Sequence, residues 1–276
     1  MSDGSPYVSL DDLVSIVKPG MQLALPRDEG GVPMAAARAL IRRGVRDLSL
    51  LCVPACGFSA DLLIGSGCVS TVEAGGIVVG EIGIGPRFRE AMKRGSIRMK
   101  DSTCPAIFSG LQAGEKGAPF GAVRGLLGSD VLKHRQDWRV IDNPFKDGGD
   151  PVVLVPAIKP DVFFFHAAWG DRFGNVWAGG RRDIVFTSHA SHAVIATVEN
   201  IWDGNLLTDL KMAPGTISSV YVSAIAHVPK GAWPMCLPGF YDENWPHIRE
   251  YMELARSDAG FQTYMEKHVM PVPVEA

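Results

Sequence analysis

The sequence predicts an α/β protein, built on an open, mostly parallel β-sheet flanked by helices and folded as a single domain over residues 1–276. Three observations lead to this fold class. Apolar runs alternate with segments of helical period, the connections between them are short, and the run ending at Cys52 is apolar without alternation. A strand with that last pattern is covered on both faces, so we expect helices on both sides of the sheet.

The first half of the chain contains the clearest alternation of strands and helices. The first two predicted helices end near a glycine, Gly44 and Gly95 respectively, as helices commonly do. The predicted strands are Met21–Leu25, Asp47–Cys52, Gly75–Gly80 and Ile97–Met99, and the predicted helices are Val32–Arg43, Phe88–Lys93 and Pro105–Ala113.

The second half is richer in strands. Residues 128–150, which include Gly148 and Gly149, are the loosest stretch, and we predict an excursion on one sheet there and not a domain linker. The predicted strands are Val152–Val155, Val162–Phe165, Val194–Val198 and Val220–Ala226, followed by a helical tail from Trp245 to Val269.

Charge and composition exclude several classes of partner. The formal net charge is −3 and the basic residues are dispersed, so we expect neither nucleic acid nor an anionic membrane as a partner. No apolar run is long enough to span a membrane, and residues 1–12 lack the apolar core of a signal peptide. The five cysteines are scattered and odd in number, which predicts reduced thiols in the cytoplasm. Cys52 and Cys56 have no second ligand pair, so no metal is predicted.

Ligands of open α/β sheets bind beyond the carboxyl ends of the strands, so these turns are the first candidates for a site. After the first predicted strand come Arg27, then Gly30 and Gly31, with Pro33 opening the next helix. The glycines let the backbone approach a ligand, the helix start favours anions, and Arg27 can bind a carboxylate or a phosphate. The alternative is a tight strand-to-helix turn with a surface arginine.

The turn from Gly80 to Pro86 resembles a dinucleotide-binding fingerprint only in part. The third glycine is missing, and the preceding strand is not the first of the sheet. We therefore predict no NAD site, and keep Glu81 and Gly83 as candidates for binding a substrate or coenzyme A.

The turn from Asp101 to Pro105 opens a helix. Pro105 suits the first helical position, which puts Cys104 at or beside the N-cap, close to Ser102. The positive end of a helix favours the thiolate form of a cysteine, so Cys104 and Ser102 are the catalytic candidates. The alternative is a small packing cysteine at a helix start.

The last predicted turn follows the aromatic strand Phe163–Phe165. We expect that strand to place His166 at its end, and Trp169 and Asn175 follow as further candidates for substrate binding. Asp171 to Asn175 has the composition of a turn. The alternative is a hairpin packed by tryptophans, in which His166 is a hydrogen-bonded structural group.

At these turns the sequence resembles the α (A) subunit of family I CoA-transferases, especially the glutaconate CoA-transferase branch, which also contains CoA-ester ring-cleaving hydrolases. The resemblance runs from about Leu10 to Met265. It is carried, in this order, by Gly31-Val32-Pro33, Val45–Leu50, Gly110–Gly114 with Gly117–Phe120, His166 with Asp171–Asn175, and Pro229–Pro234.

This resemblance implies an open α/β sheet that forms a heterodimer or heterotetramer with a homologous β subunit, with the active site between them. It implies that a β-subunit glutamate attacks the acyl-CoA, and that coenzyme A is a substrate and no cofactor is bound permanently. The α-subunit position that is Gln in ketoacid transferases and Glu in ring-cleaving hydrolases aligns with Cys104. The family's Gly-Gly-Phe before Gly-x-Pro is replaced here by Leu25-Pro26-Arg27.

Three functions follow as alternatives. The first is the α subunit of a CoA-transferase. The second is the α subunit of an acyl-CoA ring-cleaving hydrolase. That reaction requires a general base near residue 104, where this chain has a cysteine. The third is a non-catalytic subunit that only stabilises its β partner, which the replacements around Arg27 and Cys104 favour.

Overall fold

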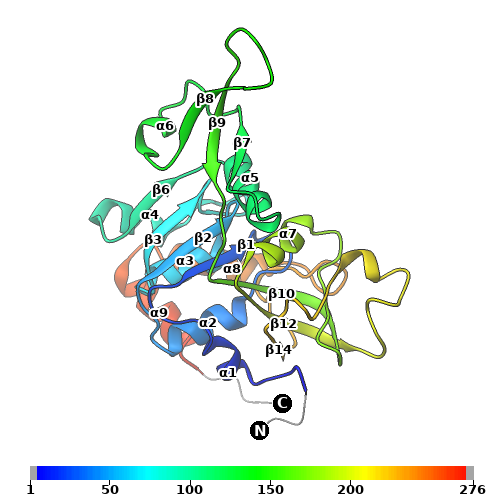
Figure 1. Cartoon of the computed structure of the whole chain (residues 1–276). Helices are drawn as coiled ribbons and strands as arrows, with labels where there is room; N and C mark the ends of the chain where they lie inside the picture. The colour runs from blue at the N-terminus through cyan, green and yellow to red at the C-terminus, as the bar shows by residue number, and fades with distance from the viewer. Residues whose placement is uncertain (1–4, 272–276) are drawn as a thin grey trace.

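A computed structural model of the chain describes residues 5–271, and a nine-stranded sheet forms its centre (Figure 1). The strands of this sheet are β1 (Gln22–Pro26), β2 (Leu48–Val53), β3 (Val69–Ala74), β6 (Arg98–Asp101), β10 (Val162–Asp171), β11 (Val176–Trp177), β12 (Ala193–Trp202), β13 (Thr216–Ile217) and β14 (Ala224–His227).

Most neighbouring strands of this sheet run parallel. Strands β14, β12, β10, β1, β2, β3 and β6 lie in that order, and each pairs in parallel with the next. The short strand β11 pairs antiparallel with the second half of β10, and β13 pairs antiparallel with β11. The predicted fold class, a mostly parallel sheet flanked by helices, is confirmed.

Helices cover both faces of the sheet. The helices are α1 (Leu10–Val14), α2 (Met34–Arg42), α3 (Phe58–Gly65), α4 (Pro86–Arg94), α5 (Cys104–Glu115), α6 (Val131–His134), α7 (Arg182–Ala190), α8 (Trp245–Leu254) and α9 (Asp258–His268), with a 3-10 turn η1 (Ala213–Gly215). Side chains of α1, α2, α3, α8 and α9 share one apolar core with the sheet, while α5 and α7 share another with its opposite face. In residues 5–271, none of the helices combines the length and the apolar character needed to cross a membrane.

Two small sheets stand apart from the central one. Strands β7 (Phe120–Val123), β9 (Pro151–Pro156) and β8 (Arg139–Asp142) form an antiparallel sheet that projects from the body (Figure 1). The stretch 128–150, predicted as a loose excursion, contains α6 and β8 and so belongs largely to this sheet. A hairpin of β4 (Val78–Val79) and β5 (Gly83–Ile84) is the second.

The predicted strand Gly75–Gly80 is wrong. The strand of the central sheet is β3, which ends just before it. Within the predicted stretch, Val78–Val79 pair in the β4–β5 hairpin and Ile77 forms a single bridge with Cys56. The hydrophobicity pattern does not indicate β3, because Glu73 is a charged residue in a buried position of that strand. Its carboxylate is paired with Lys100 at 2.9 Å and Arg135 at 2.8 Å, which makes the burial tolerable.

The predicted strand Val162–Phe165 is too short. Strand β10 continues to Asp171 because β12 pairs with it in parallel along its whole length. His166 therefore lies in the middle of the strand and not at its end. Similarly, the strand predicted at Val220–Ala226 begins only at Ala224.

The helical tail is two helices and not one. Helix α8 ends at Leu254, and Ser257 caps the start of α9 by accepting a hydrogen bond from the Gly260 N–H at 3.1 Å. Helices α3 and α7 were absent from the predicted elements. Helix α3 is buried on all sides, including its polar Ser59 and Asp61, so it lacks the amphipathic period on which a prediction depends.

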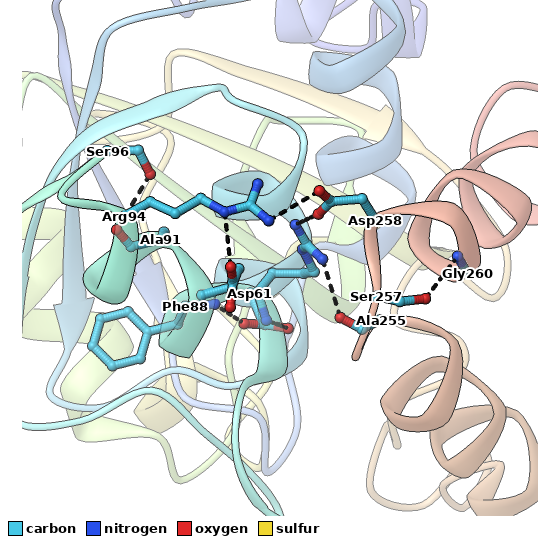
Figure 2. A network of polar contacts seen from close by, with 11 residues as sticks. Asp61, Phe88, Ala91, Arg94, Ser96, Ala255, Ser257, Asp258 and Gly260 are labelled. Carbon is cyan, nitrogen blue, oxygen red and sulfur yellow. Dashed lines mark hydrogen bonds and ion pairs between the residues drawn. The ribbon is translucent and has the colours of Figure 1, made fainter.

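A polar network fastens the C-terminal helices to α3 and α4 (Figure 2). Buried Asp61 of α3 accepts hydrogen bonds from the Phe88 N–H at 2.6 Å and the Tyr251 hydroxyl at 2.6 Å, and so caps α4 while holding α8. Arg87 reaches the Ala255 carbonyl at 3.3 Å and Asp258 at 2.7 Å. These contacts fix α8 and α9 over one face of the sheet.

Candidate active site

The turns after β1, β2, β3 and β6 meet at one edge of the sheet, because parallel strands end on the same side. The Gly75 N–H donates to the Pro54 carbonyl at 2.9 Å, and the Ser102 N–H donates to the Ala74 carbonyl at 3.2 Å. Cys56 forms a parallel bridge with Ile77. The turns after β2, β3 and β6 therefore form one continuous edge, and among them the turn from Asp101 to Pro105 was a predicted site.

A cavity of about 180 Å³ opens at this edge, beside the second half of β10. Its walls come from the turn after β1, from β10, from the chain between β11 and the start of α7, and from the segment after Met235. The lining residues are Glu29, Gly30, Gly31, His166, Ala167, Ala168, Trp177, Ala178, Gly179, Gly180, Arg181, Ile184, Leu237 and Pro238. Gly30, Gly31 and His166 were predicted site residues, and the structure brings them together.

Gly31 and His166 meet through their backbones. The His166 N–H donates to the Gly31 carbonyl at 2.8 Å, and a Cβ atom at Gly31 would lie 3.1 Å from the His166 carbonyl oxygen. Gly31 also has a φ of 90°, which a residue with a side chain rarely adopts. The glycine is needed here because the turn passes so close to β10.

Arg27 lies at the same edge but outside the cavity lining. Its side chain is half exposed and forms a loose ion pair with Glu29, 3.5 Å away. The next residue, Asp28, is buried and accepts hydrogen bonds from the Gly57 N–H at 3.1 Å and the Phe58 N–H at 2.8 Å, so it caps α3. Burial raises the pKa of Asp28 to about 7. Asp28 thus anchors the turn that presents Arg27.

Cys104 and Ser102 lie at the start of α5. Thr103 is the N-cap, and its hydroxyl accepts from the Ala106 N–H at 3.4 Å. The Cys104 side chain is exposed, and among the described residues its N–H has no acceptor. A Cβ atom at Gly75 would lie 3.5 Å from the Cys104 nitrogen and 3.4 Å from its sulfur, so the glycine leaves both uncovered. The helix start thus presents an open donor beside an exposed thiol.

The Ser102 hydroxyl is buried and has no hydrogen-bond partner among the described residues. Serine hydroxyls in protein interiors are nearly always paired. Ser102 is therefore a polar group at the sheet edge with an unused donor.

His166 is held by a buried carboxylate that the sequence reasoning missed. Glu199 of β12 accepts from His166 Nε2 at 3.1 Å, from the Tyr241 hydroxyl at 3.0 Å and from the Lys230 N–H at 2.9 Å. His166 Nδ1 lies 2.8 Å from the Thr197 hydroxyl. Because a carboxylate can only accept, the Nε2 of the ring carries the proton and Nδ1 accepts from threonine.

Burial lowers the pKa of His166, so the ring is neutral near pH 7. Burial alone would raise the pKa of Glu199, but its hydrogen bonds from His166, Lys230 and Tyr241 hold that pKa below its ordinary value. The cluster therefore consists of one negative charge with several donors. It joins β10 and β12 to the segment that contributes Leu237 and Pro238 to the cavity wall.

Trp169 and Asn175 lie elsewhere. Trp169 packs edge-on against Trp202 and Phe240, with ring centroids 5.3 and 5.8 Å apart, and is not part of the cavity lining. The Asn175 amide donates to Asp171 at 2.8 Å and accepts from the Ser219 N–H at 2.9 Å. Asn175 thus holds the turn between β10 and β11, as a hairpin residue would.

Glu81 and Gly83 lie on the β4–β5 hairpin and do not line the cavity either. They flank an exposed turn whose neighbours are Ile82, Trp245 and Arg249. Their predicted binding role is not supported by any contact with the cavity.

One group of side chains in residues 5–271 has the composition of a metal site. The ligand atoms of His247, Glu250 and His268 lie within 4.8 Å of one another on α8 and α9. However, His247 Nε2 is 2.8 Å from the Tyr264 hydroxyl, and Glu250 pairs with Lys267 at 2.6 Å. His247 and Glu250 already have hydrogen-bond or ion-pair partners, so this cluster is a structural contact between the two helices.

The signal that could have identified Glu199 and Arg181 is weak. Glu199 follows an apolar strand segment, and Arg181 precedes a helix. The contacts that bring Glu199 to His166 and Arg181 to Glu29 come from residues far away in the sequence. Only the parallel pairing of β10 with β12 brings Glu199 within reach of His166.

The chain is similar to named subunits of known enzymes. The α (A) subunit of the 3-oxoadipate CoA-transferase of Pseudomonas knackmussii is 29% identical, over 86% of this chain and 84% of its own. The cholesterol ring-cleaving hydrolase IpdA subunit of Rhodococcus jostii is 25% identical, over 95% of this chain and 92% of its own. Both relatives are named as subunits.

The fold comparison agrees. The crystal structure of glutaconate coenzyme A-transferase from Acidaminococcus fermentans superimposes with a TM-score of 0.87 at 26% identity, covering 96% of this chain and 89% of the other. The sequence model of the coenzyme A transferase family matches residues 7–223. By sequence and by fold, this chain therefore belongs to the coenzyme A transferase family, and within it to the CoA-transferase α subunits.

Proposed function

We propose that this α subunit binds an acyl-CoA thioester at the carboxyl edge of its sheet, and that a homologous β subunit supplies the glutamate that attacks it. The two chains form a heterodimer or heterotetramer in the cytoplasm, coenzyme A is a substrate, and no cofactor is bound permanently. The proposal takes the acyl group into the cavity beside β10, with the thioester near the start of α5.

One observation carries this proposal: the edge offers binding surface and unused hydrogen-bond donors but no activated nucleophile. Among residues 5–271, no base is hydrogen-bonded to the Cys104 sulfur, and His166 is fully engaged inside the protein. Glu81 lies on an exposed hairpin outside the cavity. An edge of this kind is half of a site, which a second subunit completes.

The chemistry fits the groups that are present. A carboxylate that attacks the thioester carbon creates an anionic tetrahedral centre, which collapses to a mixed anhydride and releases the coenzyme A thiolate. Donors placed at the developing oxyanion stabilise that centre. The Cys104 N–H and the Ser102 hydroxyl are unused donors at this edge, and the positive end of α5 adds to their effect. We assign oxyanion stabilisation to them.

The test is turnover of acyl-CoA esters by the co-expressed α and β subunits. Coenzyme A transfer that requires an added carboxylic acid, and that stops when the β-subunit glutamate is changed to glutamine, is the expected result. Release of free coenzyme A at the same rate without an acid acceptor would instead make the enzyme a hydrolase. Turnover that proceeds equally without the α subunit would make this chain a stabilising subunit only.

A further inference from the structure

The walls of the cavity are largely apolar. Ala168, Trp177, Ile184, Leu237 and Pro238 surround it, together with glycine and alanine backbone. A cavity of roughly 150 Å³ with such walls accommodates a benzene-sized molecule, and this one measures about 180 Å³. The space suits an acyl chain of about five or six carbons.

Arg181 is the cation in the cavity wall, and its donors are already used. Its Nε and Nη2 bind Asp183 at 2.8 and 2.6 Å, and its Nη1 binds the Glu29 carbonyl at 2.8 Å and also the Gly30 carbonyl. The guanidinium therefore braces the turn after β1 against the start of α7. Its charge is neutralised by Asp183 and is not offered to a ligand.

The other ionisable groups at the cavity do not supply a positive charge. Both ring nitrogens of His166 are bonded to Thr197 and Glu199, and burial lowers the pKa of the ring, which keeps it neutral. Glu29 at the rim is negative and is paired with Arg27. Among the described residues that line the cavity, none presents a free cation.

We propose that this cavity selects an acyl group that is short, apolar and uncharged at its far end, so that the substrate is the CoA thioester of a monocarboxylic acid. A second carboxylate would lose its water in the cavity without gaining a partner, and burying an unpaired charge is strongly unfavourable. This inference rests on the proposed function, because it takes the cavity as the acyl site.

The experiment measures how fast the complete heteromer turns over two matched CoA esters. Pentanoyl-CoA and glutaryl-CoA have the same chain length and differ at the far end, where one has a methyl group and the other a carboxylate. We expect kcat/KM for pentanoyl-CoA to be at least a hundredfold higher. From acetyl-CoA to pentanoyl-CoA we expect a rise of about fourfold per methylene, the equivalent of about 0.8 kcal/mol for each buried group.

The Asp183→Asn variant tests the assignment of Arg181. It removes the neutralising carboxylate and leaves the guanidinium free to bind the far carboxylate of glutaryl-CoA. The glutaryl-to-pentanoyl ratio of kcat/KM should then rise at least tenfold. Arg27→Ala is the control. Because Arg27 lies outside the cavity, this variant should lower kcat/KM for both esters by the same factor.

A second variant does not depend on the stability of the Asp183 variant. Ile184→Ala widens the cavity and should move the preferred chain length upward while glutaryl-CoA stays poor. A wild-type enzyme that prefers glutaryl-CoA to pentanoyl-CoA would overturn the inference and leave the proposed function intact. An enzyme that turns over no CoA ester at all would reject both.

Discussion

Cys104 is the most exposed of the cysteines and lies at the start of α5, where its thiol faces solvent. Cys236 is partly exposed, and Cys52, Cys56 and Cys68 are buried. A thiol-specific reagent applied to the native heteromer should therefore modify Cys104 first. Bound acyl-CoA should protect it, because the thioester is proposed to lie beside it.

Peptide mass spectrometry of the labelled protein measures both effects. Cys68 serves as the internal reference, since it is buried and does not line the cavity, so it should label slowly and without protection. Labelling of Cys104 that appears only after denaturation, or that acyl-CoA leaves unchanged, would remove Cys104 from the site.

The Ser102→Ala variant tests whether the Ser102 hydroxyl stabilises the oxyanion. That hydroxyl is buried without a partner among the described residues, so Ser102→Ala should leave the free energy of unfolding unchanged or slightly higher. If the hydroxyl binds the oxyanion, kcat should fall by about tenfold or more, since a lost transition-state hydrogen bond costs at least about 1.4 kcal/mol. Steady-state kinetics and thermal unfolding of the same variant are the two measurements. An unchanged kcat would exclude the role.

His166 should make the fold sensitive to acid. Its pKa is lowered in the folded protein, so below pH 6.5, its ordinary pKa, the unfolded chain binds the proton first. Stability is therefore fully present above that pH and is lost as the pH falls. His166→Gln can hydrogen-bond to Thr197 and Glu199 but cannot take up a proton, so its unfolding midpoint should fall less between about pH 6.5 and 5. Parallel slopes for the two proteins would contradict this account.

At the scale of elements, the contact between α3 and α8 is the clearest determinant of stability. The Tyr251 hydroxyl donates to the buried Asp61 carboxylate at 2.6 Å. Tyr251→Phe should lower the free energy of unfolding by about 1.5–3 kcal/mol, because the bond joins a buried hydroxyl to a charged group. Activity at low temperature should be unchanged, since neither Asp61 nor Tyr251 lines the cavity.

Arg94→Ala is the matched control for that measurement. Arg94 binds the same network through Asp258 but is exposed, and exposed ion pairs are screened by water. Urea unfolding should show a much smaller change for Arg94→Ala than for Tyr251→Phe. Equal changes would mean that the network acts at the surface and not through the buried carboxylate.

The elements also show where a sequence pattern is a poor guide. Strand β3 was missed because its ladder includes Ser70, Thr71 and Glu73, and helix α3 because it is buried on all sides. In both cases the pattern lacks the alternation that separates a core face from a solvent face. Burial of Glu73 is possible only because Lys100 and Arg135 arrive from other elements.

At the scale of the whole molecule, we expect the chain to be inactive alone. The edge of the sheet contributes a cavity and unused hydrogen-bond donors, and the proposed nucleophile belongs to the partner. The purified chain should show neither thioester exchange nor hydrolysis, and native mass measurement of a co-expressed pair should show a heteromer. Turnover by the isolated chain that is abolished by Glu81→Ala or Cys104→Ala would make this subunit self-sufficient.

The sequence by itself determined the fold class and the places where a site could form. Continuous apolar runs such as the one ending at Cys52 specify buried parallel strands, and parallel strands put Arg27, Gly30, Gly31, Ser102 and Cys104 on one edge. These are local signals, since each depends only on neighbouring residues and the period of an element.

Only the tertiary structure decided which of those residues share a cavity and what charge it carries. His166 proved to be mid-strand because β12 extends β10, and Glu199, Arg181 and Asp183 define the cavity through contacts that span long stretches of sequence. Asn175 and Glu81 follow similar turn signals and lie outside it. Long-range contacts of this kind depend on how strands and helices pack, and packing is not encoded in the period of any single segment.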